Sequence, residues 1–147
     1  HDCRVGSHVV LVNHVLLGGH VAVGDRAFLG GACAVHQFVR IGELAMVGGH
    51  AWISGDAPPF GTVVGSRPTR VVGINVVGLR RAGVSAEARL ALRGAYRALF
   101  RSRLPLLERL ASVDGRTPEV VRLLEFVRQS KRGVIGVVHA DEEGEDA

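Results

Sequence analysis

The sequence predicts a left-handed parallel β-helix of hexapeptide repeats followed by a C-terminal three-helix unit. Every sixth residue from Val5 to Ile53 is a large aliphatic, which gives nine matches without a break. Glycine follows six of these nine residues, and helical spacing of apolar residues begins near Ser85. A six-residue period is typical of a parallel β-helix, in which each unit supplies one short strand and one turn. The left hand is the usual geometry of such repeats, because the period itself does not fix it.

The aliphatic register also argues against a set of ordinary β-hairpins. Hairpin strands alternate with a period of two and vary in length, whereas this register holds at six for about 50 residues. Three units close one coil of about 18 residues, with the aliphatic side chains pointing into a three-sided prism. The nine positions are Val5, Leu11, Leu17, Val23, Leu29, Val35, Ile41, Val47 and Ile53.

The six-residue period becomes irregular after Ile53, where prolines and glycines predict a last coil, a loop and an extended exit. We therefore place the β-helix at residues 1–72 and a C-terminal helical domain at residues 73–133. Residues 134–147 end in DEEGEDA, an acidic stretch that predicts a disordered, solvated tail. The prolines of the irregular stretch are Pro58, Pro59 and Pro68.

Three helices are expected after the extended exit. The first has Ser85 as its N-cap, and a short second helix spans about residues 104–113. The third has Thr117 as its cap and Pro118 in its first turn, and Gly133 ends it. The apolar residues that should face the core are Leu92, Ala95, Tyr96, Leu99, Phe100, Val120, Leu123, Leu124 and Val127.

The composition indicates a globular protein with a basic body. Hydrophobic residues make up 47% of the chain, and the net charge is +4. The last seven residues hold five of the 14 acidic groups and none of the 18 basic ones, so the rest of the chain is strongly basic. Such a body could bind nucleic acid, an anionic membrane surface, an acidic carrier protein or a phosphorylated substrate, and charge alone does not choose between them.

The stretch of the expected first helix, SAEARLALRGAYRALFRSR, also carries a row of arginines. We expect this row to be a solvated surface, with docking of an acidic partner as the alternative. The arginines are Arg89, Arg93, Arg97, Arg101 and Arg103.

Several classes of protein are disfavoured by what the sequence lacks. No apolar run approaches the ~18 residues of a membrane-spanning helix. Cys3 and Cys33 give neither a metal-ligand spacing nor a disulfide framework, so we expect buried small hydrophobes. A cytoplasmic location is the default expectation, because no signal peptide is in view.

The 18-residue coil converts sequence spacing into spatial proximity. Residues 18 apart should stack at about 4.8 Å, the spacing of neighbouring strands. One column then contains His1, Gly19 and Gln37, and the next contains Asp2, His20 and Phe38. Asn13, Gly31 and Gly49 form a third column.

The first two columns contain the groups that an acyl transfer needs. A histidine can remove a hydroxyl proton, a carboxylate can fix its tautomer, and a glycine N–H can meet a developing oxyanion. His1 and Asp2 are adjacent, so they can touch only if the chain turns a corner there. A simple surface pair of histidine and aspartate is the alternative.

The histidine spacing does not predict a metal site within one subunit. His8, His14 and His20 are six residues apart, which puts them on three different faces of one coil. A zinc site shared between two subunits stays open as an alternative. We expect neither a metal nor another cofactor.

The chain resembles the UDP-N-acetylglucosamine acyltransferase family, which begins lipid A biosynthesis. The resemblance is carried by GGHVAVGDRAFLGGACAVHQFVRIGELAMVGG, within which AVHQFVRIG is the most distinctive run. The stretches HDCRVG, DAPPF and GINVVGLRR follow the same family in the same order. Together they cover nearly all of residues 1–132.

The resemblance implies a homotrimer that transfers a (R)-3-hydroxyacyl chain from acyl carrier protein to the 3-hydroxyl of UDP-N-acetylglucosamine. It implies His1 as the general base, Asp2 as the residue that orients it, and Gly19 as the oxyanion-binding N–H. The implied substrate contacts are His20, His36 and Gln37, with Asn75 and Arg81 at the nucleotide. The implied acyl-chain channel contains Asn13, Gly31 and Gly49, and glycine at position 49 suggests a long chain.

The sequence departs from the family pattern in three places. Val77 replaces an acidic residue near the nucleotide, and Ala82 replaces a basic residue after Arg81. GSRPTR carries one residue more than the common GNPAR loop of the family. The family also has many coils before its catalytic histidine, and none precede His1 in this sequence.

Three hypotheses about function remain. The first is this O-acyltransferase, present as a C-terminal fragment that we expect to be inactive alone. The second is another hexapeptide acyltransferase acting on an amino-sugar nucleotide. The third is a non-catalytic β-helical assembly module. None of the three invokes nucleic acid or an integral membrane segment.

Overall fold

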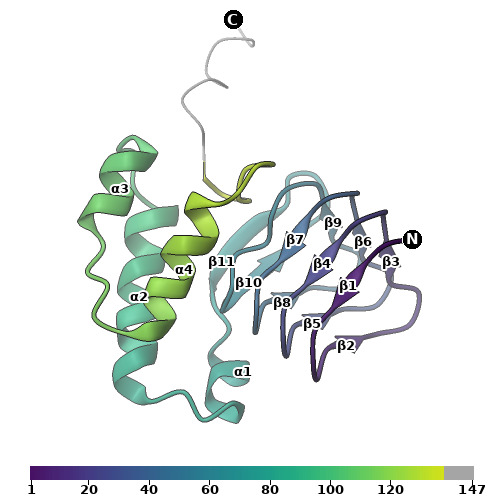
Figure 1. Ribbon diagram of the computed structural model, residues 1–147, viewed down its shortest axis with the longest axis horizontal. Helices are drawn as coiled ribbons and strands as arrows, with labels where there is room; N and C mark the ends of the chain where they lie inside the picture. The colour runs from purple at the N-terminus through teal and green to yellow at the C-terminus, as the bar shows by residue number, and fades with distance from the viewer. Residues whose placement is uncertain (138–147) are drawn as a thin grey trace, which may run out of the picture.

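The computed structural model describes residues 1–137 and shows the predicted left-handed parallel β-helix, with helices packed at one end (Figure 1). Nine two-residue strands build three coils, and each predicted aliphatic is the second residue of its strand. These strands are β1 (Arg4–Val5), β2 (Val10–Leu11), β3 (Leu16–Leu17), β4 (Ala22–Val23), β5 (Phe28–Leu29), β6 (Ala34–Val35), β7 (Arg40–Ile41), β8 (Met46–Val47) and β9 (Trp52–Ile53).

The three faces of the prism are parallel sheets in an 18-residue register. Their orders are β1-β4-β7, then β2-β5-β8 continued by β10 (Gly61–Val64) and β11 (Arg70–Ile74), and β3-β6-β9. Arg4 pairs with Ala22, which pairs with Arg40, so each step along a sheet is one coil. Residues 18 apart therefore stack as the spacing predicts.

Each corner of the prism places a non-glycine residue in the left-handed region of φ. Nine of these residues, spaced six apart from Asp2 to His50, have φ between 53° and 65°. Three columns of corner residues result, because every third corner lies above the last. They are Asp2, His20 and Phe38; His8, Arg26 and Leu44; and His14, Ala32 and His50.

The interior of the prism is aliphatic and well buried above the first coil. Val21, Leu29, Val39 and Ile53 are fully buried. Val5 in the first coil is 48% exposed, because coil neighbours cover it on one side only. The core therefore contains two residues of each buried six-residue unit, which are the predicted aliphatic and the residue two positions before it.

The region after Ile53 contains the last coil, the loop and the extended segment that the sequence predicts, and then a helix that it does not predict. β10 continues the parallel sheet next to β8, and β11 pairs with β10 antiparallel. A short helix α1 (Val76–Arg81) follows, which makes four helices rather than three among residues 1–137. The Asn75 side chain caps α1 by accepting from the Gly78 N–H at 3.0 Å. This cap favours a helix over residues 76–81, where none is expected from the sequence.

The three longer helices agree with the sequence in their starts and core faces. They are α2 (Ala86–Phe100), α3 (Leu106–Ser112) and α4 (Pro118–Arg128). Ser85 and Thr117 are the N-caps of α2 and α4, as predicted. Leu92, Leu99 and Leu123 are fully buried in the core that these helices share. α4 ends at Arg128, before Gly133, because the chain then turns back to the β-helix.

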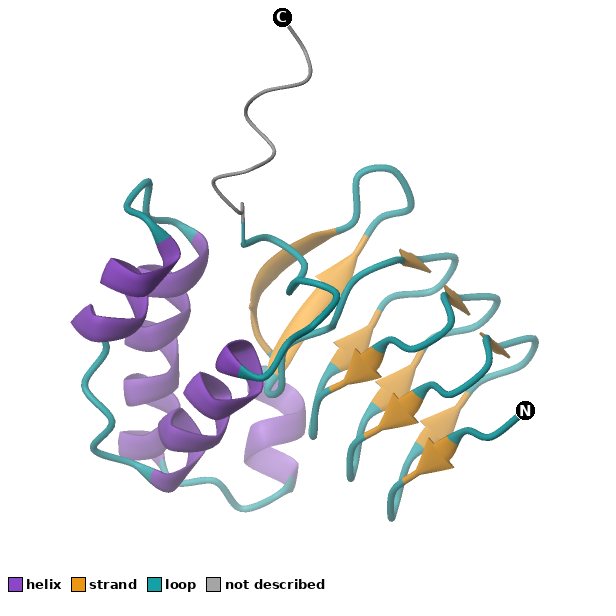
Figure 2. Ribbon diagram, turned by 45° about the horizontal axis from the view of Figure 1, so that its top comes forward, coloured by secondary structure: helices purple, strands orange, loops and turns teal. Residues whose placement is uncertain are grey.

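The return segment after α4 corrects the predicted start of the tail at residue 134. The Gly133 carbonyl accepts from the Asp56 N–H, and the Ile135 N–H donates to the Asp56 carbonyl. Val134, Ile135 and Val137 are buried, because this bridge holds them against the two cores. Figure 2 shows the backbone after α4 returning to the strands. The remaining residues of the predicted tail, 138–147, lie outside the part of the chain that the structure describes.

Candidate active site

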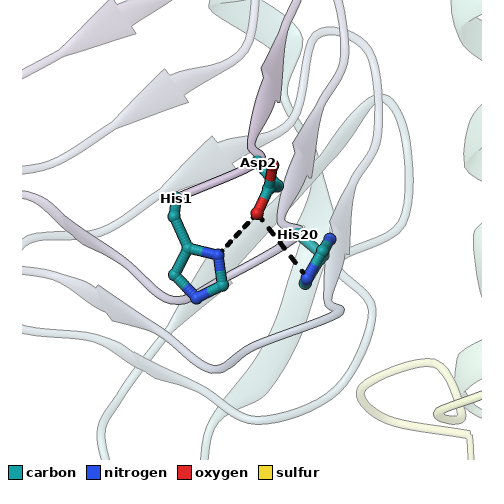
Figure 3. A group of neighbouring side chains, drawn as sticks. All are labelled: His1, Asp2 and His20. Atoms are coloured by element: carbon teal, nitrogen blue, oxygen red, sulfur yellow. Dashed lines mark hydrogen bonds and ion pairs between the residues drawn. The ribbon is translucent and has the colours of Figure 1, made fainter.

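A dyad of two contacting residues, His1 and Asp2, forms the centre of the candidate site. His1 Nδ1 lies 2.7 Å from Asp2 Oδ2 (Figure 3). Neighbouring residues on an ideal strand point to opposite faces, but Asp2 lies at a corner with φ of 58°. The corner turns the carboxylate toward the ring. A carboxylate on Nδ1 stabilises the tautomer with hydrogen on Nδ1, which leaves the Nε2 lone pair free to accept a proton.

The free Nε2 of His1 faces the backbone of Gly19 on the next coil. A methyl group added at Gly19 would lie 2.7 Å from Nε2 and 2.8 Å from Cε1 of the ring. Contacts this short do not occur, so only glycine lets the ring occupy this position. Among residues 1–137, the Gly19 N–H donates no hydrogen bond, whereas its carbonyl accepts from the Phe38 N–H at 2.9 Å. An unused N–H beside a proton-accepting nitrogen is the arrangement that acyl transfer requires.

A second histidine approaches the same carboxylate from the coil above. His20 Nε2 lies 3.9 Å from Asp2 Oδ2. The His20 ring stacks on Phe38 with centroids 4.8 Å apart and an interplanar angle of 2°, and it meets the His1 ring edge-on at 5.2 Å. The structure thus places the His20 ring next to the Asp2 carboxylate of the dyad and parallel to the Phe38 ring.

The other expected substrate contacts lie on the same corner, one coil further. Gln37 is exposed above Gly19, in the column that begins with His1. His36 is half-buried, and its Nδ1 lies 3.2 Å from the Gln37 carbonyl oxygen. These two residues therefore lie next to the dyad, one coil further along the axis of the prism.

The expected acyl-channel residues form a column on a neighbouring corner. The Ala32 N–H donates to the Asn13 carbonyl at 2.9 Å, and the His50 N–H donates to the Gly31 carbonyl at 2.9 Å. A methyl group at Gly49 would lie 3.3 Å from the Gly31 oxygen. The β3-β6-β9 face separates this corner from that of the dyad.

The two expected nucleotide-binding residues lie away from the dyad. Asn75 and Arg81 line a groove of about 870 Å³ between α1 and the β2-β5-β8 face, together with Val77. The Asn75 amide is already engaged, because it donates to the Leu44 carbonyl at 2.9 Å and caps α1. One chain therefore does not bring the residues expected at the nucleotide to its own dyad.

The groove also contains two ionisable residues for which the sequence predicted no role there. His8 and Arg26 stack on one corner and line the same groove as Arg81. The 18-residue spacing could have identified them as a column. Their position opposite α1 could not have been foreseen, because the sequence did not predict α1.

Burial alters the acidity of two groups, and both lie away from the dyad. Burial raises the pKa of the Cys33 thiol, which points into the prism. It raises the pKa of Tyr96 well above its usual value, and the Tyr96 hydroxyl donates to the Pro59 carbonyl. Both groups stay protonated at neutral pH and serve packing. Within residues 1–137 no helix is both long and apolar enough to cross a membrane.

Comparison with known proteins identifies relatives along most of the chain. A family model described as Udp N-acetylglucosamine O-acyltransferase, Domain 2, matches residues 56–135. The acyl-[acyl-carrier-protein]--UDP-N-acetylglucosamine O-acyltransferase of Paraburkholderia phymatum is 48% identical over 142 residues, covering 92% of this chain and 54% of the relative. The enzyme of the same name from Burkholderia mallei is 46% identical with the same coverage.

Solved structures agree with the sequence matches. LpxA from Acinetobacter baumannii superposes with a TM-score of 0.86 at 35% identity, covering 92% of this chain and 54% of that one. The UDP-N-acetylglucosamine acyltransferase of Arabidopsis gives a TM-score of 0.86 at 36% identity, with 92% and 51% covered. The chain spans about half the length of the curated relatives that it matches. On the match to residues 56–135, the chain belongs to the UDP-N-acetylglucosamine O-acyltransferase family.

Proposed function

We propose that this chain supplies the acid–base half of an O-acyltransferase that moves a (R)-3-hydroxyacyl chain from acyl carrier protein to the 3-hydroxyl of UDP-N-acetylglucosamine. The observation that carries the proposal is the His1–Asp2 contact of 2.7 Å with Nε2 beside Gly19. The family membership supports the choice of substrates. Transfer needs neither a cofactor nor a covalent enzyme intermediate.

The chemistry follows from the positions of three groups. His1 Nε2 takes the proton of the sugar hydroxyl as its oxygen attacks the thioester carbonyl carbon. The Gly19 N–H donates to the carbonyl oxygen as it becomes an oxyanion. Asp2 stabilises the imidazolium that forms. When the tetrahedral intermediate collapses, the carbon–sulfur bond breaks, and the imidazolium returns the proton to the leaving thiolate.

A second copy of the chain would complete the nucleotide site. Asn75 and Arg81 line the α1 groove, which lies away from the corner of their own dyad. Exposed apolar side chains around the groove include Val10, Phe28 and Val77. Burying such side chains against another chain is favourable. We infer a homotrimer in which the dyad of one copy faces the α1 groove of its neighbour.

The test is acyl transfer by this chain joined to the part of the Paraburkholderia relative that the match does not cover. The joined protein should acylate UDP-N-acetylglucosamine from 3-hydroxyacyl carrier protein. Mixing inactive His1→Ala copies with inactive Arg81→Ala copies should restore part of the rate, because some sites then combine two intact halves. No acylation, or acylation of an amino-sugar nucleotide instead, would contradict the proposed substrate. Absence of rescue by mixing would contradict the shared site.

Replacing Gly19 with alanine should lower kcat of the joined protein by about 100-fold, the cost of displacing a catalytic group by about 1 Å. The added methyl would meet the His1 ring at 2.7 Å and push the base away from the substrate. Gly94→Ala is the matched control, because a methyl at this glycine of α2 would have no neighbour within 4 Å. Unfolding curves should coincide for parent and Gly19→Ala. Equal kcat in parent and Gly19→Ala would contradict the assigned geometry.

A further inference from the structure

The corner that holds the dyad gathers three groups that bind transition metals. His1, Asp2 and His20 each offer one ligand atom, and these three atoms lie within 4.8 Å of one another. Figure 3 shows the three side chains around the Asp2 carboxylate. We propose that these residues bind a divalent transition metal such as Zn²⁺, and that the bound ion switches off the base. The switching-off part rests on the proposed function, whereas the binding part does not.

The distances suit a tetrahedral ion. Zinc binds imidazole nitrogen and carboxylate oxygen at about 2.0–2.2 Å, which places two tetrahedral ligands about 3.4 Å apart. The shared carboxylate oxygen lies 2.7 Å from His1 Nδ1 and 3.9 Å from His20 Nε2, on either side of that value. Small side-chain rotations would therefore bring all three ligands into range.

The surroundings favour a metal that can exchange with solvent. The three side chains are between 48% and 76% exposed, so water can fill a fourth position. The His20 ring is held by its stack on Phe38, so less freedom is lost when it binds. Two imidazoles and one carboxylate favour zinc, cobalt, nickel or copper over magnesium or calcium, which prefer oxygen ligands.

Metal binding would remove the proton acceptor, because it changes the tautomer of the His1 ring. A neutral imidazole has one nitrogen with a lone pair and one with a hydrogen. When the metal takes the Nδ1 lone pair, the hydrogen must reside on Nε2. Nε2 is the nitrogen that faces Gly19, and in this form it cannot accept the proton of a substrate hydroxyl. The metal would thus inhibit by occupying the far side of the ring.

The corner columns provide matched controls. His14 has the same left-handed conformation as His20, with φ of 63° against 60°, but the corner above it holds Ala32 instead of a ligand. His14→Gln therefore removes an exposed corner histidine without touching the proposed site. His20→Gln removes one ligand while keeping a polar side chain of similar length.

The experiment is a titration of the chain with Zn²⁺ by calorimetry and with Co²⁺ by visible absorption. The α-amino group of His1 is acetylated first, so that a terminal amine cannot act as a ligand. We expect one ion per chain, and at least about 10-fold weaker binding in His20→Gln and Asp2→Asn, by analogy with the loss of a group that supports a metal site. His14→Gln should bind as the parent does. No binding by the parent, or equal weakening by His14→Gln and His20→Gln, would overturn the site.

Activity provides a second and separate readout. In the joined protein, Zn²⁺ at about 10 times its dissociation constant should fill most sites and lower the acyl-transfer rate about 10-fold, and a chelator should restore it. Zinc bound at this site without a loss of rate would overturn the switching-off part. If no acyl transfer is seen even without metal, the proposed function fails, while the titration still decides whether the metal site exists.

Discussion

Acyl transfer by the joined protein should fall by about 10³-fold when His1 is replaced with alanine. Removing a positioned general base typically costs 10²–10⁴-fold. His1 is the group in contact with Asp2 whose free nitrogen faces Gly19, so its loss leaves the sugar hydroxyl without a proton acceptor. The effect should appear in kcat/KM with the native substrates. Binding of UDP-N-acetylglucosamine, measured by calorimetry, should weaken far less than the rate.

His14→Ala is the control for this prediction. His14 is an exposed histidine in the same left-handed corner conformation, and it lies on a different corner of the prism. Its replacement should leave the rate within about threefold of the parent. A His1→Ala protein that keeps the parent rate would remove His1 from the mechanism, whatever the effect at His14.

The largest loss of stability is expected from Asp56→Ala. The Asp56 side chain is 2% exposed and accepts three hydrogen bonds. Two come from the Arg40 N–H and Nε, at 2.8 and 3.2 Å, and one comes from the Ser130 hydroxyl at 2.8 Å. Alanine would leave these donors unpaired and Arg40 without its counter-charge. Breaking a buried pair in this way costs about 3–5 kcal/mol.

The free energy of unfolding, from urea titration followed by circular dichroism, measures this loss. Asp114→Ala is the matched control, because Asp114 pairs with Arg116 on the surface, where both side chains are more than half exposed. An exposed pair contributes about 0–1 kcal/mol. If the two variants lost equal stability, the Asp56 cluster would not be what joins the β-helix to the return segment.

The β-helix was predictable because its information is local and repeated. Each aliphatic from Val5 to Ile53 occupies the same position in its strand, so the register needs no knowledge of distant residues. Ser85 and Thr117 were predictable as caps for the same reason, since a cap bonds within its own turn. Asn75 is also a typical N-cap residue, but the glycines around it favoured the prediction of an extended segment.

Contacts between distant segments were not predictable from the sequence. Asp56 meets Ser130 because the chain turns back after α4, and no local pattern specifies that return. The buried residues Val134 and Val137 were assigned to the tail for this reason.

The candidate site was predictable in its columns and less so in its geometry. The 18-residue spacing stacks Gly19 above His1 and His20 above Asp2, as expected. Whether His1 touches Asp2 depends on the corner conformation at Asp2, which spacing does not reveal. The position of Asn75 and Arg81 on another side of the prism depends on α1, and so the single chain gives only part of the expected site.

The left-handed corners have a consequence for how such a protein can change over time. Since every corner residue shares one backbone conformation and successive coils repeat it, a whole coil of 18 residues can be gained or lost without disturbing the remaining backbone. Gain of a coil between Asp2 and His20 would move His20 about 4.8 Å further along the axis, the spacing of one strand. Duplication of coils therefore changes the separation of reactive groups in steps of one strand spacing, while the cross-section of the prism stays the same.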